Sequence, residues 1–307
     1  MIVHNHNVFD PWPMEDQSVQ AIITSPPYWG LRKFDIPDVQ IGDWHGQYGL
    51  EADIREYVDH TLLWIQEAHR VLRDDGVFFL NLGDTYGGSW GGYCDDKTTN
   101  LNHRYKDPSF RPPSSRARKK CKQLIPARVA IGMVDAGWYC RNDIVWYKKG
   151  MPDSSQDKFM GRYEMIYMFT KQPHYYFDLD AVRVPYQKDS ERHNLAGYGP
   201  SRVPSDAIPQ KKTQKKSYKM NPLGANPGDV WEIPPGRSRL GHYAMFPASI
   251  VERMMKCASK PGDIVVDPFI GSGTVAEVGI KLGREVVGFD LGYEDVRAER
   301  LGLLGVK

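Results

Sequence analysis

The C-terminal third of the chain contains the pattern that most restricts its fold: an apolar strand, a glycine-rich turn, a helix and a second apolar strand in direct succession. The first strand, "DIVVD", ends at Asp267, and "GTVAEVGIKLG" predicts a helix that ends at Gly283. The second strand, "EVVGFD", ends at Asp290. Strand, helix and strand in this order form a βαβ unit with a right-handed crossover. The chain is therefore predicted to be an α/β protein with a doubly wound, mostly parallel sheet.

Further alternating elements precede this unit. Predicted helices cover 53–72, 124–138 and 246–258, a last one covers 293–301, and predicted strands cover 19–24, 76–84, 139–149 and 164–171. Residues 175–180 fit a strand or a turn. We expect one domain over residues 1–307, with a glycine-rich and basic loop insert at 86–122 and a second irregular insert at 185–228. The glycines of 86–93 suit a flexible lid and an ordinary loop equally.

The net charge of +2 conceals an uneven distribution. Residues 102–122 hold eight Lys or Arg against one acidic residue, and residues 185–222 hold eight against three, so the remainder carries −10. Each segment alone could be a solvated linker. Two such segments on an acidic body, interleaved with aromatic residues, are more typical of arms that bind a polyanion.

Several classes of protein are disfavoured by composition. The chain has no run of 18 apolar residues and no basic leader followed by an apolar stretch, so neither a membrane span nor a signal peptide is expected. The four cysteines form no CxxC pair, which argues against zinc and disulfides and fits a reducing cytoplasm. The histidines of "HNH" at 4–6 lack a carboxylate or thiol partner, so no metal site is predicted.

The stretch "VVDPFIGSGT" at 265–274 has the properties of a ligand-binding turn. Gly271 and Gly273 allow a tight turn and close approach of the backbone to a ligand, and the helix that opens at Thr274 points free amides into the site. Asp290 lies 23 residues after Asp267, where an α/β nucleotide site places the acid that binds ribose hydroxyls. The spacing indicates an adenosine-bearing ligand, although it departs from GxGxxG and is not a P-loop.

A second unusual stretch is "TSPPYWG" at 24–30, where an apolar strand meets two prolines. Pro26 and Pro27 end the strand and produce a stiff turn that carries Tyr28 and Trp29. Ligands of doubly wound sheets lie beyond the carboxyl ends of strands, near the point where the strand order reverses. If the strands before the two stretches are neighbours, this turn faces the ligand. Trp29 could be a lid residue or a core residue.

In this order the two stretches resemble the motifs of amino-group DNA methyltransferases of the β arrangement (the N4-cytosine and N6-adenine family), in which Ser-Pro-Pro-Tyr precedes the cofactor motif "DPFIGSGT". "RNDIVWYKK", "YYFD", "DVWEIPP" and "HYAMFPASIVERMM" also resemble segments of this family, in the family's order. The resemblance implies an S-adenosylmethionine-dependent methyltransferase (Rossmann-like) fold with irregular basic inserts. It also implies double-stranded DNA as the partner.

The resemblance assigns the cofactor site residue by residue. The implied cofactor-binding residues are Asp267, Pro268, Phe269, Gly271, Ser272, Gly273, Thr274 and Asp290, with Phe246 and Pro247 closing over the methionine part. Two positions depart from the family. Asn7 stands where an acid is common, and "DLGYED" replaces the more common Asn-Pro after the ribose-binding acid, so cofactor affinity could differ without a change of reaction class.

The resemblance also implies a catalytic role for the turn. An exocyclic amine is a poor nucleophile because its lone pair is conjugated into the base. Ser25 Oγ and the Pro26 carbonyl would accept hydrogen bonds from both N–H groups and free that lone pair, while Pro27 stiffens the turn and Tyr28 stacks on a flipped base. Within the family a serine at the first motif position favours cytosine N4, and adenine N6 is the alternative.

The basic segments are expected to bind duplex DNA, and 185–228 lies where the β arrangement often inserts its target-recognition part. The expected DNA-binding residues are Arg111, Arg116, Arg118, Lys119, Lys120, Lys211, Lys212, Lys215 and Lys216. A protein glutamine methyltransferase is a more remote alternative because its usual motif order is reversed, and an inactive DNA-binding module conflicts with two intact motifs. We expect a monomer or homodimer in a prokaryotic cytoplasm, associated with the nucleoid, or a phage-encoded protein, with a cognate restriction endonuclease as a further partner.

Overall fold

The computed structural model describes residues 1–31, 33–88, 112–149, 156–186, 220–235 and 246–302. Within them an eight-stranded sheet has the order β1-β10-β9-β2-β5-β7-β6-β8. The strands are β1 (Ile2–Asn5), β2 (Val19–Thr24), β5 (Leu72–Leu82), β6 (Tyr139–Tyr147), β7 (Tyr163–Thr170), β8 (Val230–Glu232), β9 (Ile264–Asp267) and β10 (Glu285–Asp290). The helices are α1 (Ile54–Val71), α2 (Ile125–Asp135), α4 (Ala248–Ala258), α5 (Thr274–Lys281) and α6 (Glu294–Gly302), with short 3-10 helices η2 (Pro113–Arg116) and η3 (Asp180–Val182).

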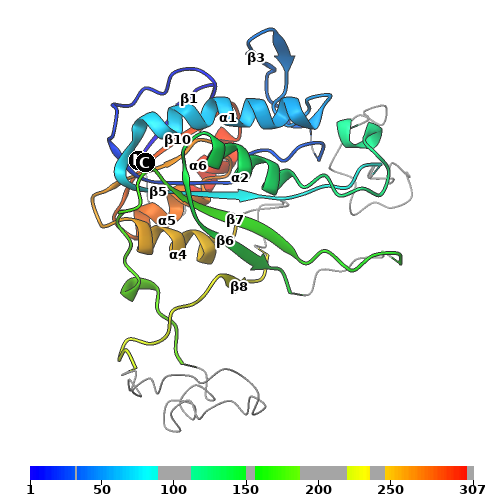
Figure 1. Cartoon of the computed structure of the whole chain (residues 1–307). Helices are drawn as coiled ribbons and strands as arrows, with labels where there is room; N and C mark the ends of the chain where they lie inside the picture. The colour runs from blue at the N-terminus through cyan, green and yellow to red at the C-terminus, as the bar shows by residue number, and fades with distance from the viewer. Residues whose placement is uncertain (32, 89–111, 150–155, 187–219, 236–245, 303–307) are drawn as a thin grey trace, which may run out of the picture.

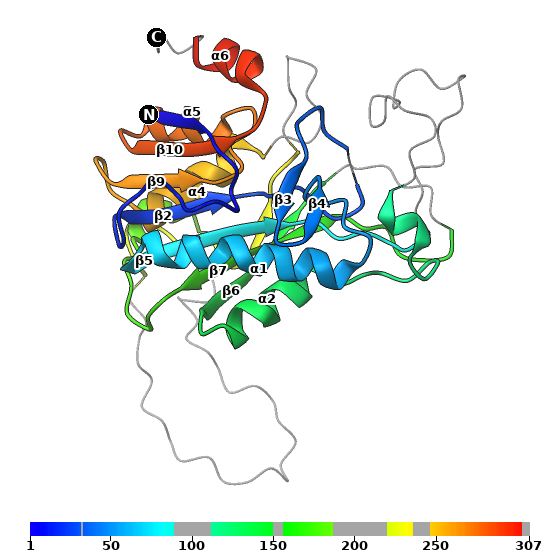
Figure 2. The same ribbon diagram turned by 90° about the horizontal axis from the view of Figure 1, so that it is seen from above.

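The sheet is mostly parallel, as the sequence predicts. β1, β10, β9, β2 and β5 are parallel neighbours, whereas β7 runs antiparallel to both β5 and β6, and β8 is parallel to β6. From the boundary between β9 and β2 the chain crosses in opposite directions, from β9 through α5 to β10 and from β2 through α1 to β5 (Figure 2). This boundary is the reversal point at which a doubly wound sheet binds ligands.

Helices cover both faces of the sheet: α1 and α2 lie on one side, and α4 and α5 on the other (Figure 1). All six residues of β2 are buried because the strand has covered faces and neighbours on both edges. Ile22 belongs to the core on the α1 side, and Ala21 and Ile23 belong to the core on the α4 side. A central parallel strand therefore appears in the sequence as an uninterrupted apolar run.

Two local features refine the sequence prediction. The hairpin β3 (Val39–Ile41) and β4 (Trp44–Gly46) was not predicted, because strands of three residues are too short to show an alternation. Residues 175–179, for which a strand or a turn was expected, form an irregular segment that leads into η3 and contain no strand. In the described part of the chain, no helix is long and apolar enough to cross a membrane.

The packing of α1 can be tested with two neighbouring positions of that helix. Ile65 is 2% exposed, whereas Leu63 is 47% exposed. Ile65→Ala should lower the free energy of unfolding by about 2–5 kcal/mol because it leaves a cavity under the helix. Leu63→Ala truncates an exposed side chain in the same way and should change the free energy of unfolding by less than about 0.5 kcal/mol. Urea denaturation of both variants measures the difference, and equal losses would contradict the packing of α1.

Candidate active site

The two sequence motifs meet because β2 and β9 are parallel neighbours. Ala21 pairs with Val265 and Ile22 with Val266, so both loops leave the same edge of the sheet. A buried hydrogen bond joins the strand ends, where Thr24 Oγ1 donates to Asp267 Oδ1 at 2.7 Å. The predicted proximity of the two loops is confirmed.

The proline turn is held by groups beneath it. The Tyr57 hydroxyl, from α1, donates to the Pro27 carbonyl at 2.9 Å. The Trp29 indole donates to the Glu51 carbonyl at 2.9 Å, and the Trp29 side chain is 2% exposed. Trp29 is therefore a core residue that anchors the turn, which decides between the two roles considered from the sequence.

A polar network surrounds Ser25 and Tyr28, the first and last residues of the Ser-Pro-Pro-Tyr motif. Tyr28 donates its hydroxyl to Glu164 Oε2 at 2.9 Å, and Ser25 Oγ lies 3.1 Å from the same hydroxyl oxygen. Asn81 Nδ2, from β5, lies within 2.6 Å of that oxygen and 3.2 Å of Ser25 Oγ. Lys148 of β6 forms an ion pair with Glu164 of β7. Sequence reasoning missed Asn81, Lys148 and Glu164, although each lies near the end of a predicted strand that borders the site.

Two further features of the turn concern the Tyr28 ring and the Pro26 carbonyl. The Tyr28 ring lies against the backbone of Gly83, where a Cβ atom would overlap the ring. Glycine at position 83 therefore makes room for the aromatic group. Among the residues that the structure describes, none donates a hydrogen bond to the Pro26 carbonyl. This carbonyl can accept a hydrogen bond from a substrate.

The glycine-rich loop after β9 has the backbone that the sequence predicts. Gly271 and Gly273 have φ of +47° and +82°, in the left-handed region that favours glycine, and Gly273 caps α5. The Gly271 amide donates to Asp290 Oδ2 at 2.6 Å, and the Gly292 amide donates to Asp290 Oδ1 at 2.8 Å. A Cβ on Gly271 would make only ordinary contacts, with the Phe269 carbonyl at 3.8 Å and Asp290 Oδ2 at 4.0 Å, so the backbone beside the Asp290 carboxylate is not tightly covered.

Two arginines of α6 hold this loop from outside the sheet. Arg297 Nη1 donates to the Gly271 carbonyl at 2.9 Å and lies 3.6 Å from Asp290 Oδ2. Arg300 Nη1 donates to Ser272 Oγ at 2.9 Å and to Thr274 Oγ1 at 2.7 Å. Sequence reasoning missed both, although their three-residue spacing in a predicted helix places them on one face.

Burial alters the acidity of both acids of this motif. Burial raises the pKa of Asp267 to about 7, against the lowering effect of its hydrogen bonds from Thr24 and the Phe269 amide. Burial also raises the pKa of Asp290, against the amides of Gly292 and Gly271 and the Arg297 charge. Hydrogen bonds from backbone amides thus offset only part of the cost of burying each carboxylate.

The remaining expected cofactor residues lie around the same loop or at the start of α4. Pro268 is buried directly after β9, and the Phe269 ring stacks on Tyr48 at 5.7 Å between centroids. Phe246 packs on the core at the α4 side, and Pro247 is the residue that precedes α4.

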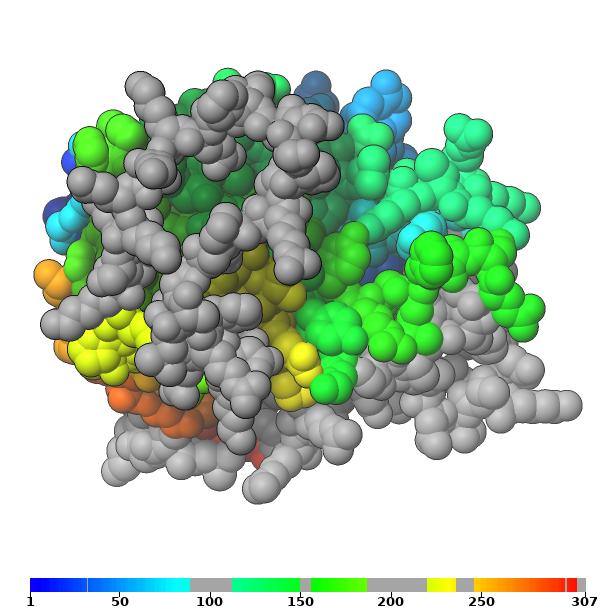
Figure 3. Space-filling model, turned by 60° about the horizontal axis from the view of Figure 1, so that its bottom comes forward, coloured from blue at the N-terminus to red at the C-terminus, as the bar shows by residue number. Residues whose placement is uncertain are grey.

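The described part of the first basic insert is fixed beside the proline turn. Ser114 Oγ, in η2, donates to the Gly30 carbonyl at 3.0 Å. Lys120 forms a 2.6 Å ion pair with Asp157, so segments 112–122 and 156–162 lie side by side at one end of the molecule (Figure 3). The exposed expected DNA-binding residues here are Arg116, Arg118, Lys119 and Lys120. The others, Arg111, Lys211, Lys212, Lys215 and Lys216, lie outside the described residues.

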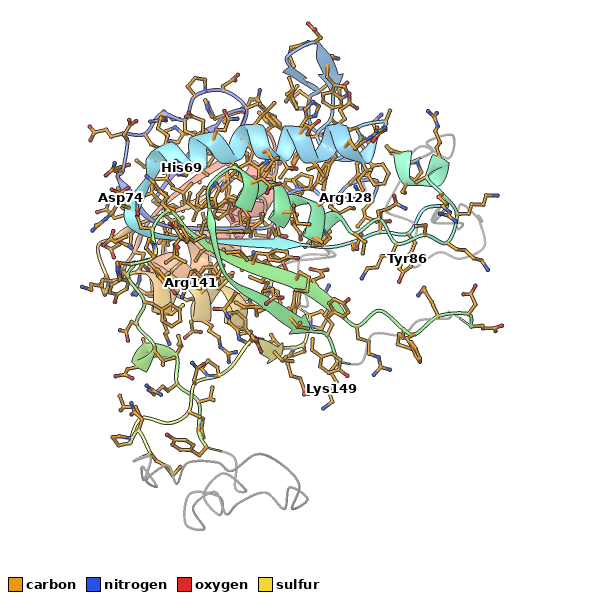
Figure 4. The ribbon with its side chains drawn as sticks, viewed as in Figure 1. His69, Asp74, Tyr86, Arg128, Arg141 and Lys149 are labelled. Atoms are coloured by element: carbon orange, nitrogen blue, oxygen red, sulfur yellow. The ribbon has the colours of Figure 1, made fainter. Side chains whose placement is uncertain are left out.

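The two ends of the sheet differ in what they carry. Tyr86 and Lys149 lie toward the end that bears the site, whereas His69 and Asp74 lie at the opposite end (Figure 4). Within the described ranges, no group of three or more His, Cys, Asp or Glu side chains is arranged to hold a metal ion.

Comparison with known proteins identifies the family. A sequence model of the N6/N4 type described as "DNA methylase" matches residues 19–299. The chain is also 33% identical over 289 residues to the type II methyltransferase M.Cfr9I of Citrobacter freundii, covering 92% of this chain and 81% of that protein. The chain therefore belongs to the N6/N4 DNA methylase family and is a methyltransferase.

Solved structures share its fold. A PvuII DNA methyltransferase described as cytosine-N4-specific matches with a TM-score of 0.62 at 18% identity, over 97% of this chain and 84% of that one. A candidate DNA modification methylase of Thermus thermophilus, in complex with S-adenosylmethionine, matches with a TM-score of 0.58 at 19% identity, over 98% and 93%. The fold is that of the S-adenosylmethionine-dependent methyltransferases.

S-adenosylmethionine is the cofactor of this family, and the loop after β9 fits it. The backbone at Gly271 is only partly covered, which lets a ligand approach it, and the Asp290 carboxylate beside it can accept hydrogen bonds from ribose hydroxyls. The first turn of α5 adds free amides at the same place.

The raised pKa of Asp267 makes stability depend on pH. The folded protein holds this proton between about pH 4 and pH 7 and the unfolded chain does not, so the free energy of unfolding should fall as pH rises through that window. The loss should reach up to about 4 kcal/mol and level off above about pH 8. Urea denaturation without cofactor measures it. Asp267→Asn should make the profile less steep, leaving the contribution of Asp290, whose pKa is also raised, whereas the exposed control Asp135→Asn should leave the slope unchanged; parallel profiles for wild type and Asp267→Asn would contradict the assignment.

Proposed function

We propose that this methyltransferase of the DNA methylase family transfers the methyl group of S-adenosylmethionine to the exocyclic N4 amine of a flipped cytosine at a specific site in duplex DNA. The observation that carries the proposal is the position of the Ser25 hydroxyl and the Pro26 carbonyl, at the end of β2 beside the cofactor loop that follows β9. Two acceptors at this edge suit an amine with two N–H groups.

The residues of the turn each have a role in this reaction. S-adenosylmethionine supplies an activated methyl group when it is bound. Ser25 Oγ and the Pro26 carbonyl accept the two N–H groups, which frees the nitrogen lone pair for in-line attack. Pro27, held by Tyr57, keeps the turn stiff, and Tyr28 offers its ring to the base. The base must leave the duplex because its amine and ring faces are inaccessible in the stack.

Two observations favour cytosine over adenine. Ser25 stands at the first motif position, and a hydroxyl there is typical of the N4-cytosine branch. The PvuII enzyme that shares the fold is also described as cytosine-N4-specific. N6-adenine methylation is the alternative that the same turn chemistry permits.

The proposed domain organisation is a single methyltransferase domain over 1–307 with two DNA-contacting inserts. Ser114, in the described C-terminal part of the insert at 86–122, is hydrogen-bonded to Gly30 beside the proline turn, so phosphate contacts there would bring the duplex to the site. The insert at 185–228 is proposed to read the target sequence. A cognate restriction endonuclease is proposed as partner because the similar proteins are type II methyltransferases.

The identity of the base can be tested directly. Nucleoside mass spectrometry of DNA from a host that expresses the protein should show N4-methylcytosine, and N6-methyladenine alone would reject the proposal. Ser25→Ala should lower the single-turnover methylation rate about 100-fold, because it removes one acceptor of the amine. It should leave the dissociation constant of S-adenosylmethionine unchanged, since Ser25 follows β2 and the proposed cofactor residues follow β9.

The proposed phosphate contacts can be tested by salt dependence. A double variant, Arg118→Gln and Lys119→Gln, should weaken DNA binding and reduce the slope of log K against log salt by about 0.9 for each phosphate that is no longer neutralised. The control, Lys256→Gln with Lys281→Gln, removes two charges from α4 and α5 and should retain the wild-type slope. Equal slopes for all three proteins would reject this segment as a DNA contact.

A further inference from the structure

The network around Tyr28 has a defined direction. Glu164 forms an ion pair with Lys148, and a carboxylate only accepts hydrogen bonds; both side chains are 18% exposed. The Tyr28 hydroxyl at 2.9 Å must therefore donate to Glu164. Its oxygen then accepts from its other neighbours.

The same reasoning orients Ser25. Asn81 is 2% exposed and its amide nitrogen only donates, at 2.6 Å from the Tyr28 oxygen and 3.2 Å from Ser25 Oγ. Since the Tyr28 proton is directed to Glu164, the 3.1 Å contact between the two hydroxyls has Ser25 as donor. This leaves a lone pair of Ser25 Oγ to accept from a substrate amine. The three groups form a chain of donors, Ser25 to Tyr28 to Glu164.

From this geometry we infer that Ser25, Tyr28 and Glu164 form a proton relay that removes the proton released when the amine is methylated. The inference rests on the proposed amine methylation and gives Tyr28 a role beyond stacking. It applies to either base, because cytosine and adenine amines release the same proton. Asn81 acts as a positioning residue that holds both hydroxyls.

The relay accounts for every bond and proton of the methyl transfer. The amine nitrogen forms a bond to the methyl carbon as the carbon–sulfur bond of the bound donor breaks, and that electron pair stays on sulfur. The nitrogen keeps the electrons of one N–H bond while its proton passes to Ser25 Oγ. The Ser25 proton passes to the Tyr28 oxygen, and the Tyr28 proton passes to the Glu164 carboxylate. One proton moves along each hydrogen bond, and Glu164 ends neutral beside Lys148.

The ionisable groups near the end of this relay come from several elements. Lys148 of β6 contacts the Glu164 carboxylate, and Tyr28 contacts it from the loop after β2. Asp84, which follows β5, pairs at 3.8 Å with Lys122, from the segment between η2 and α2. Only a charged carboxylate can accept the proton that leaves Tyr28, so the relay predicts a methylation rate that rises with pH across the range where carboxylates ionise.

Single-turnover methylation of duplex DNA, measured against pH, tests the inference. Glu164→Gln and Tyr28→Phe each remove one link and keep the shape of the side chain, and each should lower the rate about 100-fold. Both should also lose the rise of rate with pH, whereas Glu164→Asp should keep it because it retains a carboxylate. The control, Glu232→Gln, neutralises an exposed partner of Lys149 and should behave as wild type. The dissociation constant of S-adenosylmethionine reports correct folding of each variant.

The outcomes separate the two proposals. Absence of any methylated base with the wild type rejects the proposed function itself. A wild type that methylates DNA, with Glu164→Gln or Tyr28→Phe variants that keep its rate and pH profile, overturns the relay alone. A loss of rate that is equal at every pH, with the rise retained, also overturns it and assigns these residues to positioning. If Glu164→Gln does not fold, Tyr28→Phe decides between these outcomes from the other side of the same hydrogen bond.

Discussion

Two backbone pairings between β2 and β9, at Ala21 with Val265 and at Ile22 with Val266, place a turn from the start of the chain beside a loop from its end. A buried hydrogen bond from Thr24 to Asp267 joins the ends of the two strands, across 243 residues of sequence. Neither motif could act alone, because one would hold a methyl donor and the other an amine. The register of these two strands determines whether donor and acceptor face each other.

The polar network around Tyr28 depends on the antiparallel strands of the sheet. β5 and β7 are directly paired, so Asn81 and Glu164 reach the proline turn from adjacent strands, and β6 adds Lys148. These polar groups lie at strand ends, where the core meets the site. Burying most of the Glu164 carboxylate would be costly without Lys148 and without hydrogen bonds from Tyr28 and Asn81. The sheet thus supplies both the frame of the site and the charged groups that complete it.

The strong periodic signals of the sequence predicted most of the fold. The βαβ unit, the helix at 53–72 and the strand before Ser25 are all present, because long amphipathic helices and uninterrupted apolar strands record their burial directly. The β3 and β4 hairpin was missed because it contributes little to the core. Trp29 could not be placed from the sequence, since its indole is held by a hydrogen bond to the Glu51 carbonyl, 22 positions away.

The site was predictable from the sequence where its residues form a contiguous motif. It was not predictable where residues distant in the sequence meet only in the folded structure. Ser25 to Tyr28 and Asp267 to Thr274 are short stretches with their own chemistry. The positions of Glu164 at a strand end and of Arg297 on a helix face do not identify their roles, because tertiary structure brings their partners, Tyr28 and Gly271, to them. The α6 arginines also have a consequence for synthesis. They are translated after every strand of the sheet, so the loop at 271–274 gains its outer support last, when the proline turn and the insert around η2 have already been made.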